Sequence, residues 1–258
     1  MSINVSHDGA FATLTISNEE RRNAISRADM ADIANELTNL GADQNLRAII
    51  ITGSQTAFCA GADLSDFMTA SSELNEQSAA KAMEVLTKLT TAITRSEIPV
   101  IAAVEGTVAG VGVTIASACD IVIAGDKSFY TLPFGRIALT PDGGASAIIA
   151  AAVGRIKAMT MALRQDRIPV DKAEAMGLVS DVVPAGTAYE AALATAKTFL
   201  GSPRATLAET KRLLNEAALP DLDDALAREA EVQAKLLLSP NFAEGVGSFL
   251  QNRAPNYR

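Results

Sequence analysis

Two glycine-rich loops, each placed after a short apolar run, most constrain how this 258-residue chain folds. The first loop covers residues 58–64 (FCAGADL) and follows the apolar run 48–52. The second covers residues 106–112 (GTVAGVG) and follows the apolar run 100–104. Glycine permits positive φ and close backbone approach, and amides at a helix start attract negative charge. We therefore predict two strand–loop–helix units whose loops can hold one oxyanion together.

The sequence around these loops alternates strand and helix patterns. Period-two alternation over 10–16 after Asp8-Gly9 predicts a hairpin, and Ser26 followed by Asp29 predicts the start of a helix that ends near Gly41. The other predicted helices are 83–93, 110–118 and the run after 144, and the other predicted strands are 121–123 and 178–183. The polar stretch 69–78 is predicted to be a mobile loop. This order of elements is typical of an α/β fold.

Helical patterns dominate the chain from Asp171 onward. Glycine and proline interrupt them at 201–203, 219–221 and 239–240, where helices are expected to end or begin. We therefore divide the chain into a core over 1–185, which holds the site, and a C-terminal helical region over 186–258.

Composition excludes several classes of protein. A net charge of −8 and a pI near 4.8 argue against nucleic-acid binding, which needs a basic footprint. Two cysteines and no secretory pattern predict a reducing cytoplasm, and no apolar stretch is long enough for a membrane span. No Cys/His cluster has the spacing of metal ligands. The single histidine, His7, lies in the predicted hairpin, away from either loop, which disfavours a Ser-His-Asp site.

Further short segments complete a pattern that spans the chain. In order the segments are 22–25 (RNAI), 58–64 (FCAGADL), 104–112 (VEGTVAGVG), 119–121 (CDI), 141–145 (PDGGA), 175–179 (AMGLV) and 249–257 (FLQNRAPNY). This ordered set resembles the crotonase family, also called the enoyl-CoA hydratase/isomerase superfamily, over essentially the whole chain. The resemblance implies a spiral of ββα units, C-terminal helices that help to assemble a homotrimer or a dimer of trimers, and a CoA thioester as ligand, with no other bound cofactor.

The resemblance also implies roles for individual residues. The backbone N–H groups of Ala62 and Val111 would form an oxyanion hole, because enolisation of a thioester places negative charge on its carbonyl oxygen. The family usually has glycine where Val111 stands, but the peptide N–H remains available. The implied substrate-binding and CoA-binding residues are Ala24, Ala60, Asp63, Leu64, Gly110, Thr114 and Phe134. Asp63 is equally suited to cap a helix.

The reaction type depends on the acidic residues. Hydratases of the family use two glutamates, and the matching positions here are Thr114 and Phe134, neither of which can act as a carboxylate base. Asp142, in the segment PDGG, matches the single catalytic acid of several Δ3,Δ2-enoyl-CoA isomerases. Such an acid removes a proton from C2 and returns it at C4. The alternative for Asp142 is a turn or helix-cap role, for which this segment is also suited.

Two other interpretations remain open. The first is a hydratase with a displaced acid, and the second is a catalytically silent acyl-CoA-binding protein, since fold does not fix function. Dehalogenation is disfavoured because the chain has no tryptophan. Lys211, Arg212 and Arg253 are candidates for the CoA phosphates, with solvated helix faces and tail as the simpler explanation. Asp66 and Glu73 are candidates for the acyl pocket, with exposed positions as the simpler explanation.

Overall fold

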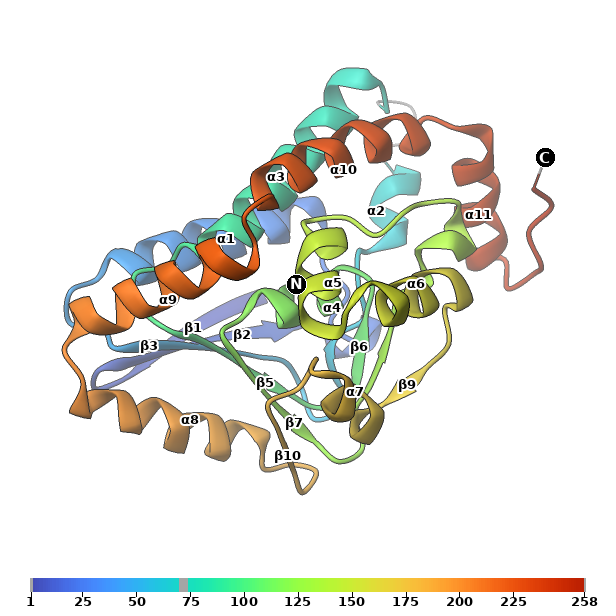
Figure 1. Ribbon diagram of the computed structural model, residues 1–258. Coiled ribbons are helices and arrows are strands. Elements are labelled where there is room, and N and C mark those ends of the chain that lie inside the picture. Colours follow the sequence, from blue (N-terminus) through green and yellow to red (C-terminus); the bar gives the residue numbers. More distant parts are fainter. Residues whose placement is uncertain (1, 70–73, 258) are drawn as a thin grey trace.

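Two β-sheets form the centre of the computed structural model, which describes residues 2–69 and 74–257 (Figure 1). The larger sheet has the strand order β1-β2-β3-β5-β7-β10, and the smaller has the order β4-β6-β8-β9. The larger sheet consists of β1 (Ser2–Asp8), β2 (Phe11–Ser17), β3 (Ala48–Thr52), β5 (Val100–Val104), β7 (Ile121–Gly125) and β10 (Asp181–Val183). The smaller consists of β4 (Ala57–Cys59), β6 (Thr107–Ala109), β8 (Phe129–Thr131) and β9 (Ile168–Pro169).

The chain alternates between the sheets in a repeated ββα unit. β3, β5 and β7 lie parallel in the larger sheet, and the strand after each of them, β4, β6 and β8, lies parallel to its equivalents in the smaller sheet. Helices close the units: α2 (Leu64–Thr69) and α3 (Glu76–Thr94), then α4 (Val111–Ala118), then α5 (Ala145–Val153) and α6 (Arg155–Arg164). This arrangement confirms the predicted spiral. Both glycine-rich segments fall in equivalent places, and each includes part or all of a short strand that the sequence does not predict: residues 58–64 begin in β4, and residues 106–112 contain β6.

Helices cover both faces of the larger sheet, which explains why its strands are continuous apolar runs. Ile49 and Ile51 of β3 point into the core beneath α1 (Arg27–Ala42) and α3, whereas Ile50 points to the opposite face. That opposite face packs against the alanines of α8 (Ala188–Thr198), which lies on the other side of the sheet from α1 and α3 (Figure 1). Successive strand side chains alternate between the two cores.

Two of the predicted boundaries depend on local caps. Ser26 caps α1 as predicted: its side chain accepts a hydrogen bond from Asp29 N at 3.2 Å, and Asp29 Oδ2 accepts one from Ser26 N at 2.8 Å. The predicted mobile loop over 69–78 is wrong at its end, because Asn75 and Ser78 form the same kind of box at the start of α3. Residues 70–73, including Glu73, lie outside the described residues.

The C-terminal helices begin and end near the predicted glycine and proline positions. They are α7 (Val170–Met176), α8, α9 (Arg204–Ala218), α10 (Leu222–Leu237) and α11 (Pro240–Leu250). Elsewhere in the chain and between α8 and α9, short 3-10 turns occupy Glu19–Arg21, Pro133–Ile137 and Phe199–Gly201. α10 runs beside α3, and α9 continues the same layer toward α1 (Figure 1). In residues 2–69 and 74–257, no helix combines the length and apolar character needed to cross a membrane.

Candidate active site

The two glycine-rich loops touch each other. Gly61 and Gly110 have φ values of +104° and +53°, which side chains rarely allow. A Cβ atom added at Gly61 would lie 3.1 Å from the carbonyl oxygen of Ala109 and 3.8 Å from the Cα of Gly110. The start of α4 and the segment before α2 therefore approach each other closely through their backbones.

In residues 2–69 and 74–257, each loop contains a backbone amide without a hydrogen-bond acceptor, Ala62 N in the first and Val111 N in the second. Ile25 N donates to Gly61 O at 2.9 Å and Asp63 N donates to Ile25 O at 2.8 Å, so the intervening amide of Ala62 points away from Ile25. Val111 is the first residue of α4, and the helical hydrogen bonds start only at Val113 N. Among the described residues, no oxygen accepts a hydrogen bond from the amide of Ala62 or Val111. Neither of these two N–H groups is therefore committed to an acceptor in the described part of the chain.

A buried asparagine holds the segment around Ala24 against the first loop. Asn23 Nδ2 donates to Ala57 O at 2.6 Å, and Asn18 N donates to Asn23 Oδ1 at 2.8 Å. Ala60 N then donates to Arg22 O at 3.0 Å. This pairing places Ala60 beside Arg22, two residues before Ala24.

We expect Asn23→Ala to lower the free energy of unfolding by about 1–3 kcal/mol, because it leaves buried backbone groups without partners. Urea unfolding followed by circular dichroism measures this change. Asn45→Ala is the control, since Asn45 is exposed and bonds only to Asp43 nearby. Equal unfolding midpoints for the two variants would contradict the role of Asn23.

Asp63 caps α2, so the capping interpretation is confirmed. Its Oδ1 accepts from Ser65 N at 3.0 Å, and its Oδ2 pairs with Arg21 at 2.6 Å. Burial raises the pKa of Asp63, but the hydrogen bonds from Ser65 and Arg21 outweigh it and hold the pKa below its usual value. Asp66 is half-buried and pairs with Arg27 Nε at 3.1 Å, which corrects the expectation of a simply exposed residue.

Asp142 is buried with one carboxylate oxygen unpaired. Its Oδ2 accepts a hydrogen bond from Gln233 Nε2 at 2.7 Å, whereas Oδ1 is buried without a hydrogen-bond partner in the described part of the chain. Burial raises the pKa of Asp142 to about 7; the hydrogen bond from Gln233 opposes the rise, and the charge of Glu229 adds to it. A carboxyl group with this pKa can both accept and release a proton near neutral pH.

Hydrogen bonds from two helices hold the backbone of the turn that carries Asp142. Thr114 of α4 donates from Oγ1 to Asp142 O at 3.1 Å, and Thr90 of α3 donates to Gly143 O at 2.6 Å. Thr114 lies three residues, or about one helical turn, after Val111, so this hydrogen bond ties the Asp142 turn to the first turns of α4. The hydroxyl of Thr114 therefore anchors the turn.

The helix-cap alternative for Asp142 is wrong. The N-cap residue of α5 is Gly144, which has no side chain to offer. Glu229 of α10 does the capping instead: it accepts from Gly144 N at 2.5 Å and from Ser146 N at 2.8 Å. The side chain of Asp142 is thus not committed to the helix start.

Phe134 closes the site with an apolar wall. It lies in the 3-10 turn Pro133–Ile137, is buried, and its Cζ would be 3.9 Å from a Cβ added at Gly110. The position where the resemblance expects a second glutamate therefore holds an aromatic ring against the second loop.

Sequence reasoning missed Gln233 and Glu229, which lie about 90 residues beyond Asp142. Both are buried although they are polar, and they are four residues apart, on one face of α10. Polar residues on the otherwise apolar face of a helix are the signal that could have found them.

The basic residues that were candidates for the CoA phosphates are engaged elsewhere. Lys211 is buried, and its Nζ lies 2.8 Å from Asp120 Oδ2 and 2.7 Å from Ile93 O, so the interpretation of a solvated helix face is wrong for it. Arg212 pairs with Glu209 and Glu216 on the exposed face of α9. Arg253 pairs with Glu244 in the tail.

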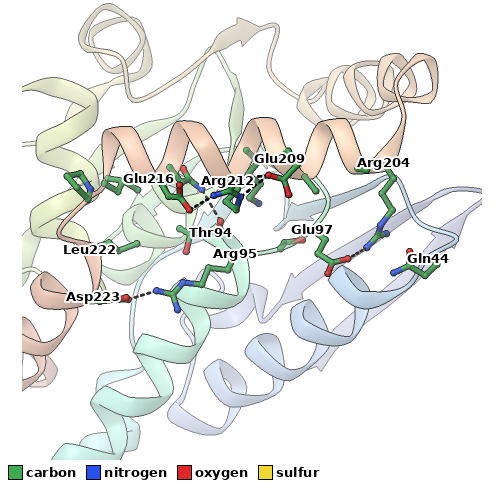
Figure 2. A pocket seen from close by; sticks show the side chains of 17 residues that line it. Gln44, Thr94, Arg95, Glu97, Arg204, Glu209, Arg212, Glu216, Leu222 and Asp223 are labelled. Atoms are coloured by element: carbon green, nitrogen blue, oxygen red, sulfur yellow. Dashed lines mark hydrogen bonds and ion pairs between the residues drawn. The ribbon is translucent and has the colours of Figure 1, made fainter.

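A separate cavity of about 1080 Å³ lies between α9 and the turn that follows α3. Figure 2 shows that its arginines point toward acidic side chains, Arg95 to Asp223 and Arg204 to Glu97. None of the residues that line this cavity belongs to the two loops or to the Asp142 turn.

The chain as a whole matches a known family. A family model described as enoyl-CoA hydratase/isomerase matches residues 7–258. The chain belongs to this family. Among curated members, the 2,3-dehydroadipyl-CoA hydratase of Escherichia coli is 30% identical over 98% of this chain and 97% of its own. The 1,2-epoxyphenylacetyl-CoA isomerase of Escherichia coli is also 30% identical, over 95% of this chain and 94% of its own.

Solved structures of the enoyl-CoA hydratase/isomerase family have the same fold. The crystal structure of an enoyl-CoA hydratase from Mycobacterium avium subsp. paratuberculosis matches with a TM-score of 0.90 and 36% identity, over 99% of this chain and 98% of its own. Hydratases and an isomerase both occur among these relatives, so family membership supports an enzyme that processes acyl-CoA thioesters.

Proposed function

We propose that this member of the enoyl-CoA hydratase/isomerase family is a Δ3,Δ2-enoyl-CoA isomerase. One observation carries the proposal: Asp142 is buried, keeps one oxygen unpaired, and has a pKa raised to about 7. The free amides of Ala62 and Val111 and the apolar wall of Phe134 support it. A single carboxyl group of this kind is sufficient for moving a double bond.

The proposed mechanism moves one proton between two carbons. The thioester oxygen lies between the amides of Ala62 and Val111, and the carboxylate of Asp142 takes a proton from C2. The electron pair of that C–H bond passes into a dienolate whose charge the two amides stabilise. The protonated Asp142 then returns the proton to C4, and the double bond lies between C2 and C3. The carboxylate is regenerated, and no water is consumed.

The two amides supply much of the rate enhancement. Removing one oxyanion-hole donor costs on the order of 3 kcal/mol in comparable enzymes. Because the donors belong to the backbone and α4 begins at Val111, they are already oriented before the substrate arrives. We propose that the CoA arm contacts Ala24, Ala60, Asp63 and Leu64, largely through their backbone atoms. Gly110 and Thr114 are also proposed to bind the substrate.

The proposal predicts how activity changes with pH. Asp142 must be ionised to take the proton from C2, so kcat/KM for 3-hexenoyl-CoA should rise with pH through an apparent pKa of about 7 and then level off. The measurement is kcat/KM between about pH 5 and 9. An unshifted carboxyl pKa near 4 would contradict the proposal.

Hydration is the second candidate, because a hydratase and a hydratase structure are among the relatives. Water addition in this family uses two carboxylates, and the second buried acid near Asp142, Glu229, is committed to the amides of Gly144 and Ser146. Incubation with 3-hexenoyl-CoA and separately with 2-hexenoyl-CoA, followed by chromatography, distinguishes the two. The isomerase proposal expects 3-hexenoyl-CoA to be converted to 2-hexenoyl-CoA. Rapid formation of 3-hydroxyhexanoyl-CoA from 2-hexenoyl-CoA would favour the hydratase. Binding without product would favour a silent acyl-CoA-binding protein.

We also propose that the chain forms a homotrimer or a dimer of trimers. Ile156 and Leu163 are 76% and 70% exposed on α6, and Leu213 and Leu214 are exposed on α9; exposed apolar side chains of this kind support burial against another copy of the chain. Light scattering measures the mass of the assembly, and a monomer would contradict this proposal.

A further inference from the structure

The carboxylate of Asp142 is held by a side chain from the C-terminal helical region. Gln233 of α10 donates from Nε2 to Asp142 Oδ2 at 2.7 Å and also to Thr140 O at 3.1 Å. Its Oε1 accepts from the amide and from the hydroxyl of Thr140, both at 3.1 Å. Every polar group of this amide side chain is therefore used on the turn that carries Asp142, and Gln233 is 1% exposed.

The orientation of Gln233 is fixed by these contacts. Because Thr140 N can only donate, the atom that it faces must be the amide oxygen, and the NH₂ group must then face Asp142. An NH₂ group donates to a carboxylate oxygen but cannot accept a proton from it. Oδ2 of Asp142 is consequently occupied in either protonation state, while Oδ1 stays unpaired.

Glu229, one turn earlier on α10, holds the other end of the same turn. It accepts from Gly144 N and Ser146 N, and its charge faces Asp142. The groups that reach the turn from α3 and α4 are the uncharged hydroxyls of Thr90 and Thr114. In the described residues, Glu229 is thus the charged neighbour that opposes ionisation of Asp142, and Gln233 is the side-chain donor that favours it, with a smaller contribution from the backbone amide of Asp142 itself.

We propose that Gln233 is a positioning residue for the isomerase reaction: it fixes Oδ2 of Asp142, so that Oδ1 is the atom that takes the proton from C2 and returns it at C4. This inference rests on the proposed function. It makes α10 a part of the reaction site rather than only a support for the core.

The test uses the full-length protein with Gln233→Met, which keeps the length of the side chain and removes its hydrogen bonds. Without the donor, the carboxylate form of Asp142 loses its partner, so the pKa of Asp142 should rise by about one unit. The carbon-13 NMR titration of the Asp142 carboxyl group measures this shift without any substrate. At pH 7, kcat for 3-hexenoyl-CoA should fall about tenfold to a hundredfold, because the base is less ionised and less well oriented. KM should stay within about twofold, because Gln233 makes no proposed contact with CoA.

Two further variants make the outcome decisive. Gln233→Glu keeps the shape of the side chain but adds a negative charge beside Asp142, so it should shift the titration upward even if Gln233→Met folds poorly. Glu231→Gln is the matched control, because Glu231 lies on the exposed face of α10 and pairs only with Lys235. It should leave both the titration and kcat unchanged.

The possible failures can be told apart. If the wild type isomerises 3-hexenoyl-CoA but neither Gln233 variant shifts the titration of Asp142 or lowers kcat, the positioning role is overturned. A loss of thermal stability with kcat and titration unchanged would equally assign Gln233 a structural role only. If the titration shifts as expected but the wild type forms no 2-hexenoyl-CoA, the contact stands and the proposed function fails.

Discussion

Replacing Asp142 by asparagine is expected to lower kcat for 3-hexenoyl-CoA isomerisation about a thousandfold, the effect of losing a general base. Asparagine has nearly the same shape, and its side-chain oxygen can still accept from Gln233. It cannot take the proton from C2. Steady-state kinetics at about pH 7.5 measures the loss.

The stability of the same variant provides the control. Burial raises the pKa of Asp142 to about 7, so the native state holds a proton that the unfolded state releases near pH 4. Ionised Asp142 therefore opposes folding as the pH rises through this window, and Asp142→Asn should be at least as stable as the wild type above about pH 7. Thermal unfolding at several pH values checks this. Full activity in the variant would contradict the account, and a variant that unfolds at the assay temperature would contradict the expected stability.

Replacing Gly112 by alanine is expected to damage both the fold and the oxyanion site. A Cβ added at Gly112 would lie 2.4 Å from the carbonyl oxygen of Cys59 and 2.9 Å from its Cβ. Since the first of these is a backbone atom, α4 must move away from the first loop. We expect the free energy of unfolding to fall by about 1–3 kcal/mol. The displacement of the neighbouring Val111 amide should lower kcat/KM about a hundredfold.

Gly247→Ala is the matched control for that experiment. Gly247 also lies inside a helix, α11, but a Cβ added there meets no atom within 4 Å. Alanine should leave kcat/KM unchanged and raise the stability by up to about 1 kcal/mol, because glycine disfavours helix formation. Equal losses of kcat/KM in both variants would show that the contact between α4 and Cys59 does not position the amide.

The features that were predictable from the sequence are those that depend on near neighbours. The capping box of Ser26, the hairpin at Asp8-Gly9 and the apolar run 48–52 each follow from a few adjacent residues, and the structure contains all three. The incorrect end of the predicted loop over 69–78 also involves near neighbours. Asn75 and Ser78 form a local capping box at the start of α3, but the polar composition of the stretch was interpreted as a loop. The crotonase resemblance then supplied the spiral, because its motifs mark the turns between units.

The features that were not predictable depend on contacts across long stretches of chain. Lys211 has the charge of a solvent-exposed helix residue, but Asp120 and Ile93 O accept its protons in the interior. Gln233 meets Asp142 only because α10 packs beside α3 and α5. Nothing in the local sequence specifies either distance, so the environment that raises the pKa of Asp142 could be described only in the folded chain.

Membership of the family does not by itself determine which reaction the site catalyses, because the loops and the acidic residues of the site have different roles. The loops that carry Ala62 and Val111 serve any reaction that passes through an enolate, and hydratases and an isomerase are both found among the relatives. The difference lies in the acids: Phe134 contributes no carboxyl group, and Glu229 is bound to amides. Asp142 keeps one unpaired carboxyl oxygen, and a single carboxyl group is sufficient for the isomerase reaction, so this feature favours the isomerase proposal.

The most direct test of that proposal follows one hydrogen atom. 3-Hexenoyl-CoA with two deuterium atoms at C2 is converted in ordinary water with enzyme in excess, and the product is examined by mass spectrometry and NMR. If Asp142 alone carries the proton, 2-hexenoyl-CoA should keep one deuterium at C2 and, in part of the molecules, carry the other at C4. A product that never carries deuterium at C4, or no 2-hexenoyl-CoA at all, would contradict transfer by a single buried carboxyl group.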